Sequence, residues 1–276
     1  MEAPTPIINE AAAFVASRLE GRKPVAGIIL GSGLGTLADR IEDAVTIPYT
    51  SVPGFPKASA IGHKGNFICG ELGGKCVLAM QGRYHYYEGY PMQTVVLPIR
   101  VMAKLGVKYL FVSNAAGTVR QDWEVGNLML ITDHINMLPN PLIGPNAEEF
   151  GTRFPDMTVA YDSQLRGMAL SIAAEEGIKL RQGIYLPLSG PTYETPAEYA
   201  FCKFAGADTV GMSTTPEVIT ARHCGLKVLG MSVVTDVAHE AGDGYVTDEN
   251  EIIRQADAAS KRMTLIFRKI IERLGN

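Results

Sequence analysis

Apolar and polar residues follow two alternating patterns along most of the chain. Mostly apolar runs predict strands, at 26–30, 67–70, 76–80, 109–113, 128–133, 209–211 and 228–234. Several runs are apolar throughout, which is typical of strands in a sheet that is covered on both faces. Apolar residues at helical spacing predict helices, at 7–20, 93–105, 163–176, 196–205, 216–224 and 250–273. Strands that alternate with helices predict an α/β fold with parallel strand pairs.

Two segments, 50–63 and 137–156, are rich in proline or glycine and predict long loops. Long loops in a compact domain are often functional. The sequence has no internal repeat, low-complexity segment or linker composition. Residues 1–276 are therefore expected to form one domain.

The charge and the cysteines narrow the class of protein. The formal net charge is −4 and the pI is about 5.8, so the basic excess of a nucleic-acid or membrane-surface binder is missing. No apolar run approaches the ~20 residues of a membrane span, and the acidic start gives no signal-peptide pattern. The four cysteines contain no C-x-x-C pair and predict free thiols in a reducing cytoplasm.

The first predicted strand ends in a loop where Gly31, Gly33 and Gly35 alternate with other residues, and a helix is expected to open at 36–40. Glycine lets backbone N–H groups approach an anion, and a helix N-terminus adds unpaired donors. Ser32 adds a hydroxyl. Because the spacing is neither G-x-G-x-x-G nor that of a P-loop, it predicts a phosphate site rather than a dinucleotide or triphosphate site. An ordinary turn between a strand and a helix is the alternative.

Polar residues also follow the next predicted strand. Ligands of open α/β sheets bind at the carboxyl ends of strands. Arg83 and His85 are two residues apart in a strand-like segment, so their side chains are expected to face the same side and to bind an oxyanion. A half-exposed aromatic strand with incidental charges is the alternative. His63, in the loop at 50–63, is either a further donor or a solvated loop residue.

The run Asn114-Ala115-Ala116-Gly117 ends the strand predicted at 109–113. Its small residues would let a ligand reach backbone N–H groups, and a plain turn is the alternative.

Polar residues also stand where three other strands are expected to end, in the segments 188–195, 210–217 and 232–236. The carboxylates of Glu194 and Asp236 match the N–H groups of a heterocycle, and Tyr193 offers a face for stacking. The alternative is a helix-capping Ser213 and a solvated Glu194.

A phosphate site and a base site in one cavity imply a sugar between them. The five histidines lack metal-ligand spacing, so no metal is expected. No Cys–His or Ser–His–Asp nucleophile is visible from spacing, and phosphate itself could be the nucleophile.

At these residues the chain resembles the trimeric, low-molecular-mass purine nucleoside phosphorylases over essentially its whole length. The motifs that carry the resemblance are 30–35, 82–89, 114–117, 190–195, 210–218 and 221–226. The resemblance implies a single nucleoside phosphorylase domain, with a central twisted mixed β-sheet flanked by helices. It implies that a purine nucleoside and inorganic phosphate give a free base and ribose 1-phosphate, with phosphate as co-substrate and no cofactor. It also implies a homotrimer with sites near the subunit interfaces, and a role in purine salvage.

The resemblance assigns roles residue by residue. The phosphate-binding set is Ser32, His63, Arg83, His85, Ala115 (backbone) and Ser213. The nucleoside-binding set is Tyr87, Ala115, Ala116, Phe154, Tyr193, Glu194, Val210, Gly211, Met212, Thr235, Asp236 and Glu249. Within these sets, His85, Glu194 and Asp236 are the expected catalytic residues, and Phe154 would reach into a neighbouring subunit's site. Tyr185 is placed near the sugar.

The chain departs from the family pattern at two positions. Asp236 stands where the family usually has Asn, which donates to purine N7, and Glu249 stands where a His near the ribose 5′-OH is usual. An ionised Asp236 cannot donate, so either it is protonated in a dry pocket or it accepts from an exocyclic amine. The second reading favours 5′-methylthioadenosine or adenosine as substrate. Glu194 pairs with N1–H and favours 6-oxopurines such as inosine and guanosine, which we expect, and it also fits xanthosine.

Two other classes of function stay open on the sequence alone. One is a nucleotide-cofactor oxidoreductase built on the glycine turn, and the other is a purine-binding protein without catalysis. Phosphate-dependent loss of inosine would separate both from a phosphorylase.

Overall fold

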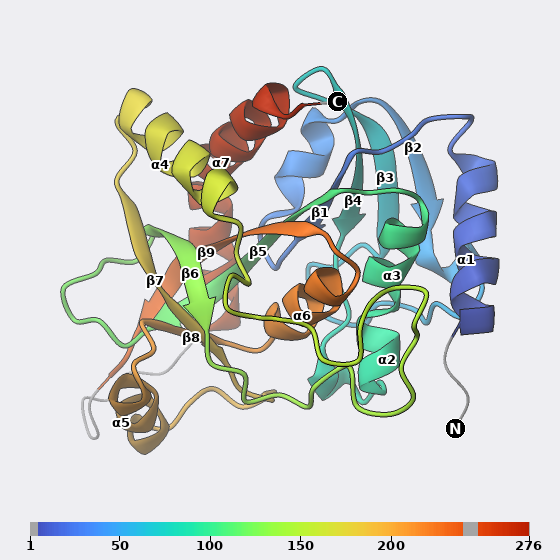
Figure 1. Ribbon diagram of the computed structural model, residues 1–276. Helices are drawn as coiled ribbons and strands as arrows, with labels where there is room; N and C mark the ends of the chain where they lie inside the picture. The colour runs from blue at the N-terminus through green and yellow to red at the C-terminus, as the bar shows by residue number, and fades with distance from the viewer. Residues whose placement is uncertain (1–4, 240–247, 276) are drawn as a thin grey trace.

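The computed structural model describes residues 5–239 and 248–275, and a mixed β-sheet runs through its centre (Figure 1). The strands within these residues are β1 (Ala26–Leu30), β2 (Glu42–Pro48), β3 (Asn66–Leu72), β4 (Lys75–Gln81), β5 (Tyr109–Thr118), β6 (Leu128–His134), β7 (Leu180–Pro187), β8 (Thr209–Gly211) and β9 (Lys227–Val237). Their order is β2-β3-β4-β1-β5-β8-β7-β6-β9, and β9 pairs again with β5. The strands β5, β8, β7, β6 and β9 therefore form a closed ring, and β1, β4, β3 and β2 extend the sheet outward from β5.

The parallel pairs decide where the site lies. β1 is parallel to both β4 and β5, and β5 is parallel to β9. Because the carboxyl ends of parallel strands meet at one edge, the segments that follow β1 and β4 gather beside the last residues of β5 and β9.

Helices cover both faces of the sheet (Figure 1). Within the described residues they are α1 (Thr5–Arg18), α2 (Met92–Val95), α3 (Leu97–Lys104), α4 (Ser163–Glu175), α5 (Pro196–Ala205), α6 (Thr215–His223) and α7 (Glu249–Arg273), with short 3₁₀ turns η1 (Gly35–Arg40), η2 (Tyr49–Ser51) and η3 (Tyr86–Glu88). Successive side chains of β1 pack on opposite faces of the sheet. Ile28 packs in the apolar cluster that contains α4 and α7, whereas Ile29 packs in the cluster that contains α1, α3 and α6.

The predicted fold class is confirmed, and four local predictions need correction. The helix expected to open at 36–40 is only the short 3₁₀ turn η1, so the N-terminus of an α-helix does not follow the glycine loop as predicted. β5 runs on to Thr118, so 114–117 is strand and the plain-turn alternative is wrong. The helix predicted at 93–105 is divided into α2 and α3, because Pro98 in the first turn of α3 has no N–H to continue the earlier helix.

The fourth correction concerns strands that the apolar runs do not indicate. β2 is a mostly exposed edge strand with polar residues at Glu42, Asp43 and Thr46. β7, from which the segment at 188–195 was expected to leave, carries Arg181, Gln182 and Gly183, which interrupt its apolar pattern.

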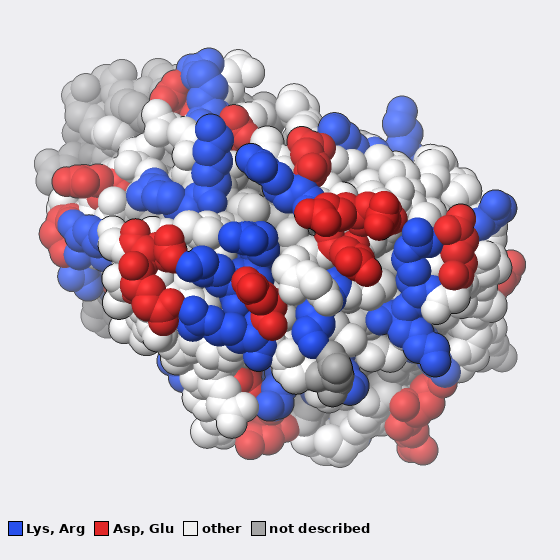
Figure 2. Space-filling view, turned by 90° about the horizontal axis from the view of Figure 1, so that it is seen from above, with Lys and Arg blue, Asp and Glu red and all other residues white. Residues whose placement is uncertain are grey.

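The surface carries both signs of charge. Basic and acidic side chains are interspersed over the face that Figure 2 shows from above. The ion pair Arg273–Glu175 joins α7 to the last residue of α4, and Lys269–Glu176 joins α7 to the residue that follows it. No helix in the described part of the chain is long and apolar enough to cross a membrane.

Candidate active site

A cavity of about 310 Å³ lies where the ends of β4, β5, β8 and β9 meet. Most of the predicted site residues line it: Ser32, Arg83, His85, Tyr87, Ala115, Ala116, Tyr193, Glu194, Val210, Gly211, Met212, Ser213, Thr235 and Asp236. These residues come from segments as far apart in sequence as the glycine loop and β9. The structure therefore brings the predicted anion-binding and base-binding groups into one cavity.

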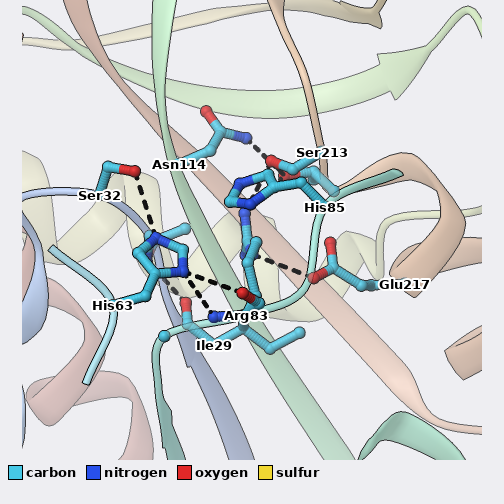
Figure 3. A network of polar contacts seen from close by, with 12 residues as sticks. Ile29, Ser32, His63, Arg83, His85, Asn114, Ser213 and Glu217 are labelled. Atoms are coloured by element: carbon cyan, nitrogen blue, oxygen red, sulfur yellow. Dashed lines mark hydrogen bonds and ion pairs between the residues drawn. The ribbon is translucent and has the colours of Figure 1, made fainter. Parts of the chain in front are cut away.

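Arg83 is the central cation of the site, and its side chain is completely buried. Its Nη1 donates to the Ser213 hydroxyl at 2.8 Å and to the Thr214 hydroxyl at 3.3 Å (Figure 3). Its Nε lies 3.0 Å from Oε1 of Glu217, which is also buried, in an ion pair without hydrogen-bond geometry. Nη2 has no hydrogen-bond partner among the described residues. An anion in the cavity would supply the acceptor that this donor needs.

The junction that positions Ser213 is strained. Thr214 has φ +71°, which is rare for a β-branched residue, and its hydroxyl accepts a 2.8 Å hydrogen bond from the Asn114 amide. The Ser213 N–H donates to the Tyr185 hydroxyl at 3.3 Å. Thr214, not Ser213, precedes the first helical residue of α6, and it caps nothing with its side chain. The helix-capping alternative for Ser213 is therefore wrong.

His63 lies behind Ser32 rather than on the cavity wall. Burial and the nearby His85 lower the pKa of His63 to about 3, so its ring is neutral. Nδ1 of His63 lies 2.8 Å from the Arg83 backbone nitrogen and 3.0 Å from the Arg83 carbonyl oxygen, so it accepts from the N–H in one tautomer and donates to the carbonyl in the other. Nε2 of His63 lies 3.2 Å from the Ser32 hydroxyl and hydrogen-bonds it in either tautomer (Figure 3). Gly82 (φ +108°) permits this, because a Cβ there would lie 2.7 Å from His63 Cβ.

His85 is held from two sides. Its ring stacks on Tyr87 at 4.7 Å between centroids, and its Nδ1 lies 3.4 Å from Glu88. Burial opposes ionisation of Glu88, but hydrogen bonds from His85 and Ser59 outweigh it and hold the pKa of Glu88 at about 2. The carboxylate is therefore ionised and orients the His85 ring.

The other end of the cavity is acidic. Asp236, in β9, is buried, and a register shift in the β5–β9 pairing places it opposite Gly117. Glu194 is half-buried, and burial together with the charges of Glu198 and Asp236 raises the pKa of its carboxyl group. The Tyr199 hydroxyl donates to Asp236 Oδ2 at 3.3 Å.

Two further predicted residues, Phe154 and Tyr185, do not line this cavity, and the side chain of a third, Glu249, is outside the described residues. Phe154 is 85% exposed and lines a separate surface cavity. Tyr185 is not on the cavity wall, but its hydroxyl packs against Gly211, which is, since a Cβ on Gly211 would be 2.5 Å from that hydroxyl; its place near the sugar stays a prediction. Glu249 is the first residue of α7, but its side chain is outside the described residues, so the 5′-OH contact stays a prediction. Ile252 and Ile253, in the first turn of α7, line the cavity.

Sequence reasoning assigned no role to Tyr199, Thr214 or Glu217. Thr214 directly follows Ser213 and Glu217 ends the same motif at 210–217, so their place in the motif was a signal for both. Tyr199 gave no signal of this kind, since a tyrosine on a helix is usually a packing residue. Among the described residues, no group of three or more His, Cys, Asp or Glu could hold a metal ion.

The family model of the phosphorylase superfamily matches residues 25–272. The chain is 46% identical to purine nucleoside phosphorylase 1 of Geobacillus stearothermophilus over 97% of each chain. It is 51% identical to purine nucleoside phosphorylase 1 of Bacillus subtilis over 84% of this chain and 85% of the relative. The crystal structure of the Schistosoma mansoni enzyme in complex with adenosine matches with a TM-score of 0.93 at 45% identity, over 98% and 97% of the two chains.

The chain therefore belongs to the phosphorylase superfamily. Within it, the chain groups with the purine nucleoside phosphorylases, which are pentosyltransferase enzymes.

Proposed function

We propose that this enzyme converts 6-oxopurine ribonucleosides and deoxyribonucleosides, with inorganic phosphate, into a free base and the sugar 1-phosphate. The observation that carries the proposal is the polarity of one cavity. Arg83 and Ser213 line the same cavity as Glu194 and Asp236. Along β5, Asn114 hydrogen-bonds Thr214 beside Ser213, whereas Gly117 is paired with Asp236, which separates the cationic group from the acidic one. Two further observations come from relatives: the Schistosoma mansoni enzyme has been solved with inosine, and a Schistosoma enzyme with guanosine.

Phosphate would bind at the cationic end. Arg83 supplies the charge and the unpartnered Nη2, and Ser32 and Ser213 supply hydroxyl donors. His85 and the backbone N–H of Ala115 complete the set, while His63 acts through Ser32. Buried donors that are already oriented need little reorganisation when the anion arrives.

Phosphate held in this way would lie under C1′ of the sugar, which Tyr87 and Met212 would line. A phosphate oxygen forms the new bond to C1′ as the bond from C1′ to the purine N9 breaks. The sugar becomes positive and the purine takes up the electron pair, so donors that strengthen toward the departing base lower the barrier. Near-attack positioning of phosphate lowers the barrier further.

Recognition of the base would be divided between the two carboxyl groups. Ionised Glu194 accepts from N1–H of a 6-oxopurine, protonated Asp236 donates to N7, and Tyr193 stacks on the ring. The second candidate is a 6-aminopurine nucleoside, adenosine or 5′-methylthioadenosine, from whose amino group an ionised Asp236 would accept. The adenosine complex of the Schistosoma mansoni enzyme favours keeping this candidate.

We also propose that the enzyme is a homotrimer, with Phe154 entering a neighbouring subunit's site. Phe154, Ile143 and Met137 belong to one loop and are 85%, 69% and 49% exposed, which is typical of an association surface. The roles in purine salvage and in the cytoplasm stay predictions.

The test is loss of inosine with and without inorganic phosphate. The proposal expects hypoxanthine and ribose 1-phosphate only when phosphate is present, and a kcat/KM for inosine above that for adenosine. Adenosine as the better substrate would replace the first candidate by the second. Inosine loss that is independent of phosphate would exclude both.

A further inference from the structure

A further cavity lies outside the candidate active site and contains a buried arginine. It has a volume of about 340 Å³ and lies between the helices α2 and α3 and the loop 139–147. Arg100, from α3, lines this cavity, and only 5% of the residue is exposed. The two cavities share no lining residue within the described part of the chain. The arginine therefore belongs to a separate place in the fold.

The guanidinium of Arg100 lacks the partners that a buried charge normally has. Its Nη1 is buried and has no hydrogen-bond partner among the described residues. Its Cζ lies over the Phe150 ring, 5.1 Å from the centroid, but the Lys104 ammonium shares that ring at 5.4 Å. Glu149 is the acid that acts on Arg100, and its carboxylate already pairs with Lys104. Because a buried charge without a partner is costly, this arrangement calls for an anion.

The other titratable groups near Arg100 do not supply that anion. Burial raises the pKa of the Cys224 thiol to about 11, so the thiol is uncharged at neutral pH. Burial, followed by the charge of Arg100, lowers the pKa of His223, so this ring is neutral as well. Burial also lowers the pKa of Arg100 itself, but an arginine keeps its proton in proteins. The positive charge in the cavity wall is therefore uncompensated.

The other polar side chains of the cavity hold its own wall in place. Nε2 of Gln93 donates to the Ile143 carbonyl at 3.2 Å. The Asn140 side chain accepts from a backbone N–H two residues further on at 2.9 Å, and the Asn146 amide donates to a backbone carbonyl at 3.1 Å. Most of the remaining lining residues are prolines or aliphatic. Among the described residues that line the cavity, Arg100 is the only charged one.

We propose that this cavity binds a small organic acid that carries one carboxylate on an apolar body. A guanidinium holds a carboxylate through two parallel N–H bonds, and the apolar wall covers the rest of the molecule. A phosphate is a poorer match, because the cavity offers a single cation and little other polar contact. The volume has room for on the order of ten water molecules, which is more than one acidic side chain of a second copy would displace. The inference goes beyond the proposed function, because it concerns a different cavity.

The proposal predicts that the empty site costs the protein stability. Methionine is similar in length to the aliphatic part of arginine, so Arg100→Met removes the buried charge and keeps most of the packing. It should therefore raise the Tm of the acid-free protein by about 2 °C or more. A purely structural role for Arg100 predicts the opposite sign, since its loss would then remove stabilising contacts.

Benzoate is the probe for binding, because it carries one carboxylate on a flat apolar ring, and benzamide is its uncharged match. Saturating inorganic phosphate is present throughout, so that the anion-binding groups of the active site are occupied. At about 20 mM, benzoate should raise the Tm of the unaltered protein by about 3 °C, which corresponds to a Kd of about 1 mM. Benzamide should give no shift, and benzoate should give none in Arg100→Met.

The matched control variant is Arg18→Met. Arg18 also lies over a phenylalanine ring, 5.1 Å from its centroid, but it is exposed. Arg18→Met should respond to benzoate as the unaltered protein does, and its acid-free Tm should not rise. Both variants should keep kcat/KM for inosine within twofold, since neither residue lines the active site.

Crystals of the unaltered protein soaked with 4-bromobenzoate locate the acid directly through the anomalous signal of bromine. The proposal expects bromine in this cavity and the carboxylate on Arg100. Bromine only at other places, a benzoate shift that persists in Arg100→Met, or a lower Tm of acid-free Arg100→Met would overturn the proposal. A change in oligomeric state in Arg100→Met without any benzoate binding to the unaltered protein would overturn it too, and would assign Arg100 to a contact between copies.

Discussion

The Glu217 carboxylate lies 3.0 Å from the Arg83 guanidinium, and neither side chain reaches solvent. A buried charge that loses its partner is strongly destabilising. The ion pair therefore both stabilises the fold and directs the other guanidinium nitrogens into the cavity.

Glu217→Gln should lower the free energy of unfolding by about 3 kcal/mol, because Arg83 is left as an uncompensated buried charge. The KM for phosphate should rise about tenfold, or ~1.4 kcal/mol, since the guanidinium loses the contact that orients it. Urea unfolding and initial rates at varied phosphate measure the two effects. The control is Glu124→Gln at an exposed position, which should change neither. A normal KM in a destabilised Glu217→Gln protein would mean that the pair serves the fold alone.

The lowered pKa of His63 predicts that the folded protein loses stability in acid. Its pKa is lowered from 6.5 to about 3 in the folded protein, so the unfolded chain binds more protons below pH 6.5. Its effect on stability is therefore absent above pH 6.5 and grows unfavourable as the pH falls toward 3, reaching about 2 kcal/mol at pH 5. His63→Gln should unfold with a shallower pH dependence than the unaltered protein between pH 6.5 and 5. Equal slopes would show that the ring is not held neutral.

Asp236 predicts the alkaline behaviour of the reaction. If Asp236 donates a proton to N7, the reaction needs an acid at this position, and inosine phosphorolysis should decline at high pH. Asn donates from its amide at every pH, so Asp236→Asn should flatten the alkaline fall in kcat. Adenosine turnover should drop in the same variant if the second substrate candidate holds. A pH profile that Asp236→Asn leaves unchanged argues against general acid catalysis by this residue.

If Phe154 enters a neighbouring subunit's site, two different inactive or weakened variants should restore activity when they are mixed in one trimer. Phe154→Ala should leave the stability of the subunit within ~0.5 kcal/mol, since the side chain is 85% exposed, but it should raise the KM for inosine. Arg83→Ala should be inactive through loss of phosphate binding. Trimers that mix the two variants should be more active than either alone, because a Phe154 side chain then enters a site that keeps Arg83. Mixtures no more active than the average of the two variants would place Phe154 outside any site.

Much of the site could be read from the sequence because polar residues stand at the ends of apolar strands. Ser32 follows β1 and Asp236 ends β9, and neither residue suits the apolar run that precedes it. Parallel pairing then brings such residues together. The pattern does not tell how long β5 is, because Asn114 and its small neighbours suit a turn as well as a buried strand.

The supporting residues could not be predicted in the same way. Glu217 after a proline at a helix start favours an exposed partner of the helix dipole, and only the tertiary structure buries it against Arg83. Tyr199 lies on a helix whose other residues are mostly exposed. Its contact with Asp236 depends on the packing of α5 against the end of β9, which periodicity does not encode.

The central claim is that inorganic phosphate attacks the sugar directly, and isotopic labelling tests it. Inosine is incubated with the enzyme and phosphate that carries ¹⁸O at all four oxygens, and the sugar product is analysed by mass spectrometry. The account predicts ribose 1-phosphate that retains all four labelled oxygens, with no free ribose. Free ribose, or a sugar phosphate in which the oxygen on C1′ is unlabelled, would contradict it.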